Sequence, residues 1–505
     1  MRTAAISPAR RDVCVSKRLI PLFVCCFLMT VAGCGGASSP NSNTTTSTPQ
    51  VDSSRDSLLN GSYVFAIADK GCACRFAAAG SLQADGAGHI SAGLIDVNSD
   101  DSVQTAVPIT GTYNIGQDGR GTASLAAGTA SYQFRFAVVS NQRALIMGFD
   151  THQNASGTID LASPVTSLAP NSYVFHVSGM DGFGEAIEMA GTFVLDAKGN
   201  VTSGVADLHD NQDIEANIPL QAGSALNLSF SSGRTTGQVV TPLVTLGFAL
   251  YAIDSHHYKL VSKNKNLCPT SGCSPAPVLI GDLYQSSAST ITGAYAFTLY
   301  GWSEGQPLPF AAGGVFNVDG TGSVSGAEDI NNNGSVNKAL PLTGSVTIAS
   351  TGRGTATLAG PAATSTFAVY PWATGVEIIE IDSNAVAGGS AFPQQDAPYS
   401  AASLKGNFAY GATGSSGNNS DALAAFSADG NGSLSGTMDL NTVGSPQSGL
   451  ALTGTYSLTG QSGAAKFQTA VNTQNVGLYP VIHSRVLTLS LDSSVIMTGE
   501  FEQQQ

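Results

Sequence analysis

The feature that most constrains this chain is a short aromatic segment that returns four times, at intervals of roughly 110 residues. In each copy two aromatic residues stand two positions apart, so that on a β-strand both side chains face one side and can enter one core. The copies lie at 61–65, 171–175, 293–297 and 406–410. Because each repeat is long enough to enclose its own core, the pattern predicts four tandem modules.

An aspartate followed by glycine-rich residues comes after each aromatic segment, at 85–88, 196–199, 319–322 and 429–432. Aspartate can accept hydrogen bonds from the backbone that follows it, and glycine adopts positive φ without strain. These segments are therefore predicted to be hairpin turns between strands.

The modules are expected to be all-β, because short apolar segments alternate with turn residues and no long helical period is present. Each module is predicted to hold about eight antiparallel strands in a small up-and-down barrel, with a two-sheet β-sandwich as the alternative. The barrel is favoured because the last segment of a module, such as 281–285, is strand-like and could pair with the first. In the first module the eight strands are centred near Tyr63, Leu82, Leu94, Ile109, Ala123, Phe134, Ile146 and Ile159.

The N-terminus has a basic start and an apolar run at 19–32 that is short for a membrane span. At its end, Val31-Ala32-Gly33-Cys34 resembles the lipobox of bacterial lipoproteins. The resemblance covers about the first 34 residues and implies cleavage before Cys34 and lasting attachment through lipid on its thiol. Ordinary secretion is the alternative. Gly35 favours the outer membrane, so we expect a lipid anchor in the cell envelope, with the chain exposed outside the cytoplasm.

These features predict six segments: a signal peptide at 1–33, a lipidated flexible tether at 34–57, and β modules at 58–164, 165–287, 288–398 and 399–505. Without residues 1–33, which hold five of the 21 basic and one of the 35 acidic residues, the formal charge is about −18. A charge of this sign disfavours nucleic acid as a partner.

Four cysteines follow Cys34, and export to an oxidising compartment favours disulfides. Cys268 and Cys273 would close a local turn, whereas a bridge between Cys72 and Cys74 would be strained. Pairing across the two groups and a four-thiolate zinc site are the alternatives.

Asp329, Asn331 and Asn333 are spaced like the first oxygen donors of a calcium loop. Leu340 stands where the bidentate glutamate of such a loop is expected. Equivalent Asp-x-Asn or Asp-x-His segments recur in the other modules, which favours a repeated polar turn after a strand over calcium, and no cofactor is otherwise expected.

Three patterns that could indicate catalysis were weighed. The segment 301–305 matches a G-x-S-x-G nucleophile elbow but opens no helix, so we interpret it as a loop. The pair His256-His257 has no third ligand in view. Glu377 and Glu380 stand three apart on a predicted strand and would face opposite sides, unlike a glycosidase pair.

The modules share turn and core features rather than one unusual pocket, which favours a noncatalytic binding or scaffold array over an enzyme. Candidate ligand-binding residues are Trp302, Trp372 and Tyr300, whose rings suit stacking on sugars. The partner would be a glycan, a cell-wall polymer or a protein. An extracytoplasmic enzyme acting on polysaccharide, with its site in one divergent module, is the alternative.

Overall fold

The computed structural model describes residues 53–69, 75–100, 102–150, 154–264, 275–286, 290–305, 308–361, 363–415, 419–443 and 445–505. The span Asp52–Gln505 forms one compact unit. Besides strands, its described residues form two short 3₁₀ turns, η1 (Asp56–Leu58) and η2 (Ala401–Ser403), and none of their helices is long or apolar enough to be a membrane-spanning segment. The signal peptide, the lipidation site Cys34 and the expected disulfide residues Cys72, Cys74, Cys268 and Cys273 lie outside the described residues.

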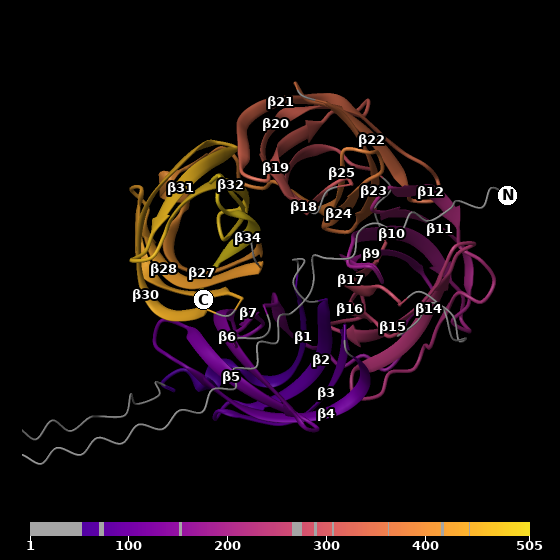
Figure 1. The fold of residues 1–505 in the computed structure, drawn as a ribbon, viewed down its shortest axis with the longest axis horizontal. Helices are drawn as coiled ribbons and strands as arrows, with labels where there is room; N and C mark the ends of the chain where they lie inside the picture. Colours follow the sequence, from indigo (N-terminus) through magenta and orange to yellow (C-terminus); the bar gives the residue numbers. More distant parts are fainter. Residues whose placement is uncertain are drawn as a thin grey trace, which may run out of the picture. The chain divides into compact units, whose positions relative to one another are not determined.

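The strands form four groups, each wound into a barrel (Figure 1). Barrel 1 comprises β1 (Asn60–Ala68), β2 (Phe76–Asp85), β3 (His89–Ser99), β4 (Val103–Ile115), β5 (Arg120–Ala127), β6 (Ala130–Ser140), β7 (Arg143–Gly148) and β8 (Ser156–Leu161). Barrel 2 comprises β9 (Ser172–Met180), β10 (Ala186–Leu195), β11 (Val201–Asp210), β12 (Asp213–Pro219), β13 (Ala225–Leu226), β14 (Arg234–Val240), β15 (Thr245–Ala252), β16 (His257–Ser262) and β17 (Val278–Gln285).

Barrels 3 and 4 repeat this plan. Barrel 3 comprises β18 (Gly293–Ser303), β19 (Pro309–Val318), β20 (Ser323–Asn332), β21 (Ser335–Ile348), β22 (Gly354–Ala359), β23 (Thr364–Trp372), β24 (Gly375–Glu380) and β25 (Ala385–Pro393). Barrel 4 comprises β26 (Tyr399–Ser400), β27 (Lys405–Ser415), β28 (Asn419–Asp429), β29 (Ser433–Thr442), β30 (Ser445–Gly460), β31 (Ser462–Gln468), β32 (Thr473–Ile482), β33 (Arg485–Ser490) and β34 (Ile496–Gln503).

Pairing follows chain order and is antiparallel throughout. β1 pairs with both β2 and β8, and β18 with both β19 and β25, which closes barrels 1 and 3. Barrel 4 closes where β30 pairs with β31, and β26 lies beside β30 as an extra strand. In barrel 2 the equivalent of β4 is divided into β12 and β13, and backbone hydrogen bonds from Val201 to Ser224 and from Leu226 to Gly199 join β13 to the start of β11.

The all-β prediction is confirmed, and the topology is that of up-and-down barrels rather than sandwiches. Each of the eight strands expected in the first module coincides with one of β1–β8. The predicted pairing of the last and first strands is also present, since β17, which contains residues 281–285, pairs with β9.

The hairpin turns form as the Asp-Gly segments predict. Asp85 Oδ1 accepts hydrogen bonds from the backbone N–H groups of Ala87 and His89 at 2.7 and 3.0 Å. Gly86 and Gly88 have φ of 74° and 92°, a conformation that strains residues with a Cβ. Equivalent aspartates cap the corresponding turns of the other barrels.

Each barrel encloses its own core, into which both aromatic residues of the repeated first strand point. These residues are Tyr63 and Phe65, Tyr173 and Phe175, Tyr295 and Phe297, and Phe408 and Tyr410. Burial of such rings contributes roughly 1.5–3 kcal/mol each, so the repeated pair anchors every barrel.

Four further apolar clusters lie between barrels. Val64 and Tyr251 belong to a cluster between barrels 1 and 2, and Val174 and Tyr370 to one between barrels 2 and 3. Barrels 3 and 4 meet around Tyr300, Tyr479 and Leu489. Barrel 4 returns to barrel 1 through Ala137, Leu145, Ala409 and Leu423. Because each barrel contacts the next and the fourth contacts the first, the barrels close into a ring.

The interpretation of the Asp-x-Asn segments as turns is corrected here. Asp96 and Asn98, Asp207 and His209, Asp329 and Asn331, and Asp439 and Asn441 lie within β3, β11, β20 and β29. Their side chains point away from their own barrel and bond the next one around the ring. The turn itself is made at 333–334, where Asn333 and Gly334 have φ of 48° and 87° and connect β20 to β21.

Asp207 shows how these contacts are built. Its carboxylate is fully buried and accepts hydrogen bonds from Arg353 Nε and Nη2, at 2.6 and 2.7 Å, and from the Tyr370 hydroxyl. Asp96 likewise accepts hydrogen bonds from Arg234 and from the Tyr251 hydroxyl. Asp439 keeps only the arginine partner, Arg120. Asp329 keeps only the tyrosine, Tyr479, because Ser462 stands at the arginine position.

Candidate ligand-binding site

A cavity of about 1010 Å³ lies where the four barrels meet, and residues of every barrel line it. They include Arg143 and Thr158 from barrel 1, His257, Lys259 and Asp282 from barrel 2, Trp372 and Phe392 from barrel 3, and Arg485 and Glu500 from barrel 4. A cavity of this size is in the range of small-molecule and oligomer sites, which makes it the first candidate for a ligand.

The last strand of each barrel shapes this cavity through one repeated glycine. The glycines are Gly157, Gly281, Gly389 and Gly499, and a Cβ at any of them would collide with the backbone of the first strand of the same barrel. The first and last strands can therefore approach closely at the centre of the ring. The residues one and three positions after each glycine point outward from their barrel. Those that line the cavity are Thr158, Asp282, Tyr284, Ser390, Phe392, Glu500 and Glu502, whereas Asp160 does not line it.

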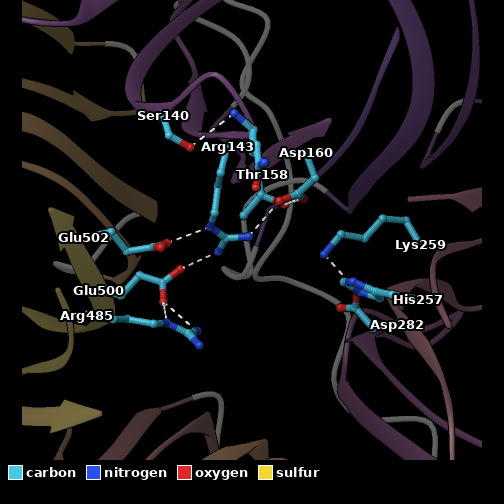
Figure 2. A network of polar contacts seen from close by, with 11 residues as sticks. Ser140, Arg143, Thr158, Asp160, His257, Lys259, Asp282, Arg485, Glu500 and Glu502 are labelled. Atoms are coloured by element: carbon cyan, nitrogen blue, oxygen red, sulfur yellow. Dashed lines mark hydrogen bonds and ion pairs between the residues drawn. The ribbon is translucent and has the colours of Figure 1, made fainter. Parts of the chain in front are cut away.

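Arg143 joins barrels 1 and 4 across the cavity wall (Figure 2). Its guanidinium donates to Asp160 at 2.7 Å, to Glu500 at 2.9 Å and to Glu502 at 2.6 Å. Glu500 also accepts from Arg485 Nε at 2.8 Å. Burial alone would raise the pKa of Glu500, but Arg485 and Arg143 lower it to about 2. The pKa of Glu502 is instead raised, because burial and the neighbouring Glu500 outweigh the attraction of Arg143. Glu500 is therefore the carboxylate that the two arginines hold charged at neutral pH.

A second charged group faces the first from barrel 2 (Figure 2). Asp282 Oδ1 lies 2.8 Å from Lys259 Nζ and 2.6 Å from His257 Nε2. Burial opposes ionisation of Asp282, yet Lys259 and His257 hold its pKa well below the usual range. The pKa of Lys259 is raised, because attraction to Asp282 and Asp160 outweighs its burial.

A row of aromatic contacts runs along the cavity from barrel 2 to barrel 3 and ends at the guanidinium of Arg485 in barrel 4. The ring of Tyr284 lies 4.5 Å from that of His257 and 3.9 Å from that of Trp372, to which it is nearly parallel at 3°. Phe392 meets Trp372 edge-on at 6.4 Å, and the Arg485 guanidinium lies 4.1 Å above the Phe392 ring. Such contacts make this wall rigid while leaving aromatic edges on the cavity.

His176 joins barrels 2 and 3 beside the main cavity. Its Nε2 lies 2.7 Å from Glu188 Oε2 and its Nδ1 lies 3.0 Å from Glu377 Oε2. Burial lowers the pKa of His176, but the two carboxylates raise it to about 10, so the ring carries a proton at neutral pH. This group lines a further space of about 250 Å³ that shares residues with the main cavity, among them Lys259 and Asp282.

The three aromatic residues predicted for ligand binding are placed differently from one another. Trp302 and Tyr300 are 7% and 6% exposed; Tyr300 still reaches both cavities, while Trp302 reaches the smaller one. Trp372 is half-buried and lies in the row of aromatic contacts. The interpretation of 301–305 as a loop is corrected for residues 301–303, which lie in β18. The Ser303 hydroxyl donates a hydrogen bond to Asn332 Oδ1 at 2.9 Å.

The residues predicted for calcium are engaged in contacts between and within barrels. Asp329 Oδ1 accepts from Ala339 N at 2.6 Å, and Asn331 Nδ2 donates to three backbone carbonyls of barrel 4 at 2.9–3.1 Å. Asn333 lies in the hairpin turn. Over the described ranges, no cluster of three or more His, Cys, Asp or Glu side chains is arranged to hold a metal ion.

Sequence reasoning weighed His256 and His257 only as metal ligands and missed the acidic and basic residues of the central cavity. A signal for them exists, because the repeated closing glycine is followed by Thr and Asp, Asp and Tyr, Ser and Phe, or Glu and Glu in the four modules. The outward positions differ while the inward ones remain apolar. A site shared by four barrels is asymmetric only if the outward residues of the repeated strand differ from one barrel to the next.

No protein-family model matches the chain, and no curated protein matches it. Among solved structures, the chain is similar to one described as intact Ap-TbpB with its N and C lobes. The similarity has a TM-score of 0.18 and 9% sequence identity, and it covers 89% of this chain and 96% of that chain. A likeness this weak carries no conclusion about function.

Proposed function

We propose that this protein is a noncatalytic, lipid-anchored binding protein outside the cytoplasm, and that its central cavity takes a hydroxyl-rich ligand such as an oligosaccharide of a glycan or cell-wall polymer. The observation that carries the proposal is the cavity shared by all four barrels. Because each barrel contributes different side chains to the cavity, the site suits one asymmetric ligand. The features that the barrels share, such as the inter-barrel aspartates, serve to close the ring.

The chemistry of the walls supports an uncharged polar ligand. Asp282 and Glu500 are each bonded to cationic side chains, so a charged ligand would have to displace an existing ion pair. Hydroxyl groups can instead share the remaining lone pairs and N–H groups of these fixed pairs. The edges of Trp372 and Phe392 add apolar surface of the kind that packs against sugar rings.

Placement in the cell envelope rests on the lipobox-like segment that ends at Cys34. Lipid on this cysteine, with the Gly-, Ser- and Thr-rich residues after it as a tether, would hold the ring near a membrane surface, most simply that of the outer membrane. Mass measurement of the mature N-terminus tests this part: an unmodified Cys34 would overturn the anchor while leaving the binding proposal standing.

A binding screen with the purified full chain tests the ligand. Soluble oligosaccharides from glycans and cell-wall polymers are titrated by calorimetry, and the same mixtures are examined for cleaved products. We expect binding without product. Product release would establish the alternative, an enzyme acting on polysaccharide, and binding to proteins but to no saccharide would contradict the proposed ligand class.

A blocking variant locates the site. Thr374 lies in the exposed β23–β24 turn at the cavity, so Thr374→Trp narrows the space with little effect on the barrel. The matched control is Asn431→Trp, at an exposed turn that does not line the cavity. The first variant should weaken binding at least tenfold and the control should not; equal binding by both would exclude the central cavity.

A further inference from the structure

The interior of barrel 3 is incompletely filled. A cavity of about 90 Å³ lies inside it, with apolar walls that include Phe297, Phe310, Phe316 and Phe367. Phe310 and Phe316 are only partly buried although they pack against the core. A single water needs about 10–15 Å³, so the space is large enough for a compact organic molecule. It shares no lining residue with the central cavity.

The missing volume follows from substitutions at equivalent strand positions. Val369 pairs with Ile378 as Phe136 pairs with Ile146 in barrel 1, so Val369 replaces a buried phenylalanine. Four residues earlier on the same strand, Ser365 stands where barrel 1 has Tyr132. Two large rings that fill barrel 1 are thus absent from barrel 3. Phe316 stands where barrel 1 has Leu82, but this one larger side chain leaves space unfilled, which is unusual for a protein interior.

Barrel 3 also places two carboxyl groups inside. Glu328 pairs with Gly314, and the equivalent positions of barrels 1, 2 and 4 hold the apolar residues Ile95, Ala206 and Met438. Glu380 pairs with Phe367, and its equivalents are the small residues Gly148, Ser262 and Ser490.

Glu328 lies beside Gly360 at the end of β22. Glu380 shares a side-chain hydrogen bond with Ser365 at the start of β23, so both acids lie at the same end of the cavity. Glu380 is 3% exposed, whereas Glu328 and Ser365 are partly exposed. Burial and the neighbouring Asp329 raise the pKa of Glu328 to about 7, and burial and Asp382 raise the pKa of Glu380 well above its ordinary value. Burying a carboxyl group is costly, so its retention in an otherwise apolar space points to a ligand that interacts with it.

We propose that the interior of barrel 3 binds a small apolar molecule carrying a basic nitrogen, such as a compact alkylamine or arylamine. The apolar body replaces the two missing rings, and the ammonium group pairs with Glu328 and Glu380. This site is separate from the central cavity, and the proposal does not depend on a saccharide ligand.

Calorimetric titration of the purified full chain with benzylamine, and with toluene and benzyl alcohol as uncharged molecules of similar size, tests this proposal. We expect one benzylamine to bind per chain, with an affinity at least tenfold higher than that of either uncharged molecule at pH 7.5. Proton release should accompany binding, measured in buffers of different ionisation enthalpy, because the carboxyl groups lose protons as the ammonium arrives. No binding, or equal binding of all three without proton release, would overturn the proposal.

Two variants and a control complete the test. Glu328→Gln should weaken the binding of benzylamine at least tenfold and leave the binding of toluene unchanged. Ser365→Tyr, which restores the ring found in barrel 1, should abolish binding of both molecules. Glu215→Gln, at an exposed acid of barrel 2, is the control and should bind as the unmodified chain does. Circular dichroism and melting confirm that each variant is folded. Unchanged benzylamine binding by folded Glu328→Gln would contradict the assigned pairing.

Discussion

At the residue scale, the ring is held by buried polar groups whose partners lie on another barrel. Asp207 is fully buried and accepts hydrogen bonds from Nε and Nη2 of Arg353. Asp329, in the equivalent place, accepts from Tyr479 and has no arginine partner among the described residues. Charge-assisted bidentate pairs are stronger than neutral hydrogen bonds, and breaking one leaves the other charge buried. The four equivalent aspartates therefore differ in what their loss costs.

Asp207→Asn should lower the free energy of unfolding by about 3–5 kcal/mol, because Arg353 would remain buried without a counter-charge. Asp329→Asn should cost about 1 kcal/mol, the scale of one ordinary hydrogen bond. Asp118→Asn, at a side chain that is 42% exposed, is the control and should cost less than about 1 kcal/mol. Urea unfolding measures all three, and equal losses at Asp207 and Asp329 would contradict the role given to Arg353.

His176 predicts a pH dependence. Because its folded pKa is raised to about 10, the folded state keeps a proton that the unfolded state loses above about 6.5. Its contribution to stability is complete below about pH 6.5 and is lost as the pH rises towards 10. Between pH 7.5 and 9 the free energy of unfolding should therefore fall by up to about 1.4 kcal/mol per pH unit.

This slope should become shallower in His176→Gln and remain in His256→Gln, whose ring is 70% exposed. Glu328 and Asp210, whose pKa values are raised to about 7 by burial and neighbouring acids, and Glu380, whose pKa is raised by burial and Asp382, are present in both variants, so the difference between the two slopes reports on His176. Urea unfolding at several pH values gives the slope, and an identical slope in both variants would remove His176 as its source.

At the element scale, the strands were predictable and the role of their outward faces was not. Alternation and the repeated aromatic pair specify a strand and its inward face, and all eight strands of barrel 1 were placed from them. Outward side chains such as Glu500 and Glu502 contact Arg143, 357 and 359 positions away, which no local pattern encodes. For the same reason the Asp-x-Asn segments resembled polar turns, although they lie on strands and bind the neighbouring barrel.

The closing glycine of each barrel gives a prediction at this scale. Gly281→Ala would press a methyl group against the backbone carbonyl of His176 and separate β17 from β9, so it should cost about 1–3 kcal/mol. Gly320→Ala is the control, because its Cβ would enter open space and its φ is not positive, and it should be neutral or stabilise by up to about 1 kcal/mol. Thermal melting distinguishes them, and similar melting temperatures would refute the crowding argument.

At the scale of the whole molecule, the repeat predicted four barrels but not the ring. Sequence self-comparison shows how many modules exist, whereas the contact of barrel 4 with barrel 1 depends on an angle accumulated over all the interfaces. The candidate site exists only because of that closure, since its walls come from all four barrels. Of the tryptophans expected to bind a ligand, Trp372 lines the central cavity and Trp302 the smaller space beside it, and ligand binding by either stays a prediction.

Arg143→Ala should loosen the ring where barrel 4 meets barrel 1. The change leaves Asp160 and Glu502 without their shared cation, at a cost of about 3–5 kcal/mol. Hydrogen exchange should quicken in β7 and β34, while β10 and β23, at the opposite interface, should exchange as before. Arg55→Ala is the control. Equal acceleration at both interfaces would show general unfolding rather than opening at this one.

The contact between barrels runs head to tail, with an accepting aspartate on one face and its arginine or tyrosine donor on the other. Three of the four contacts join barrels that are adjacent in the chain. The fourth joins the two ends of the array. A molecule opened there presents an unpaired acceptor, Asp439, on barrel 4 and an unpaired donor, Arg120, on barrel 1, and two such molecules satisfy both by closing on each other. The contact that completes the monomer is therefore also the one through which domain-swapped dimers and longer polymers would grow.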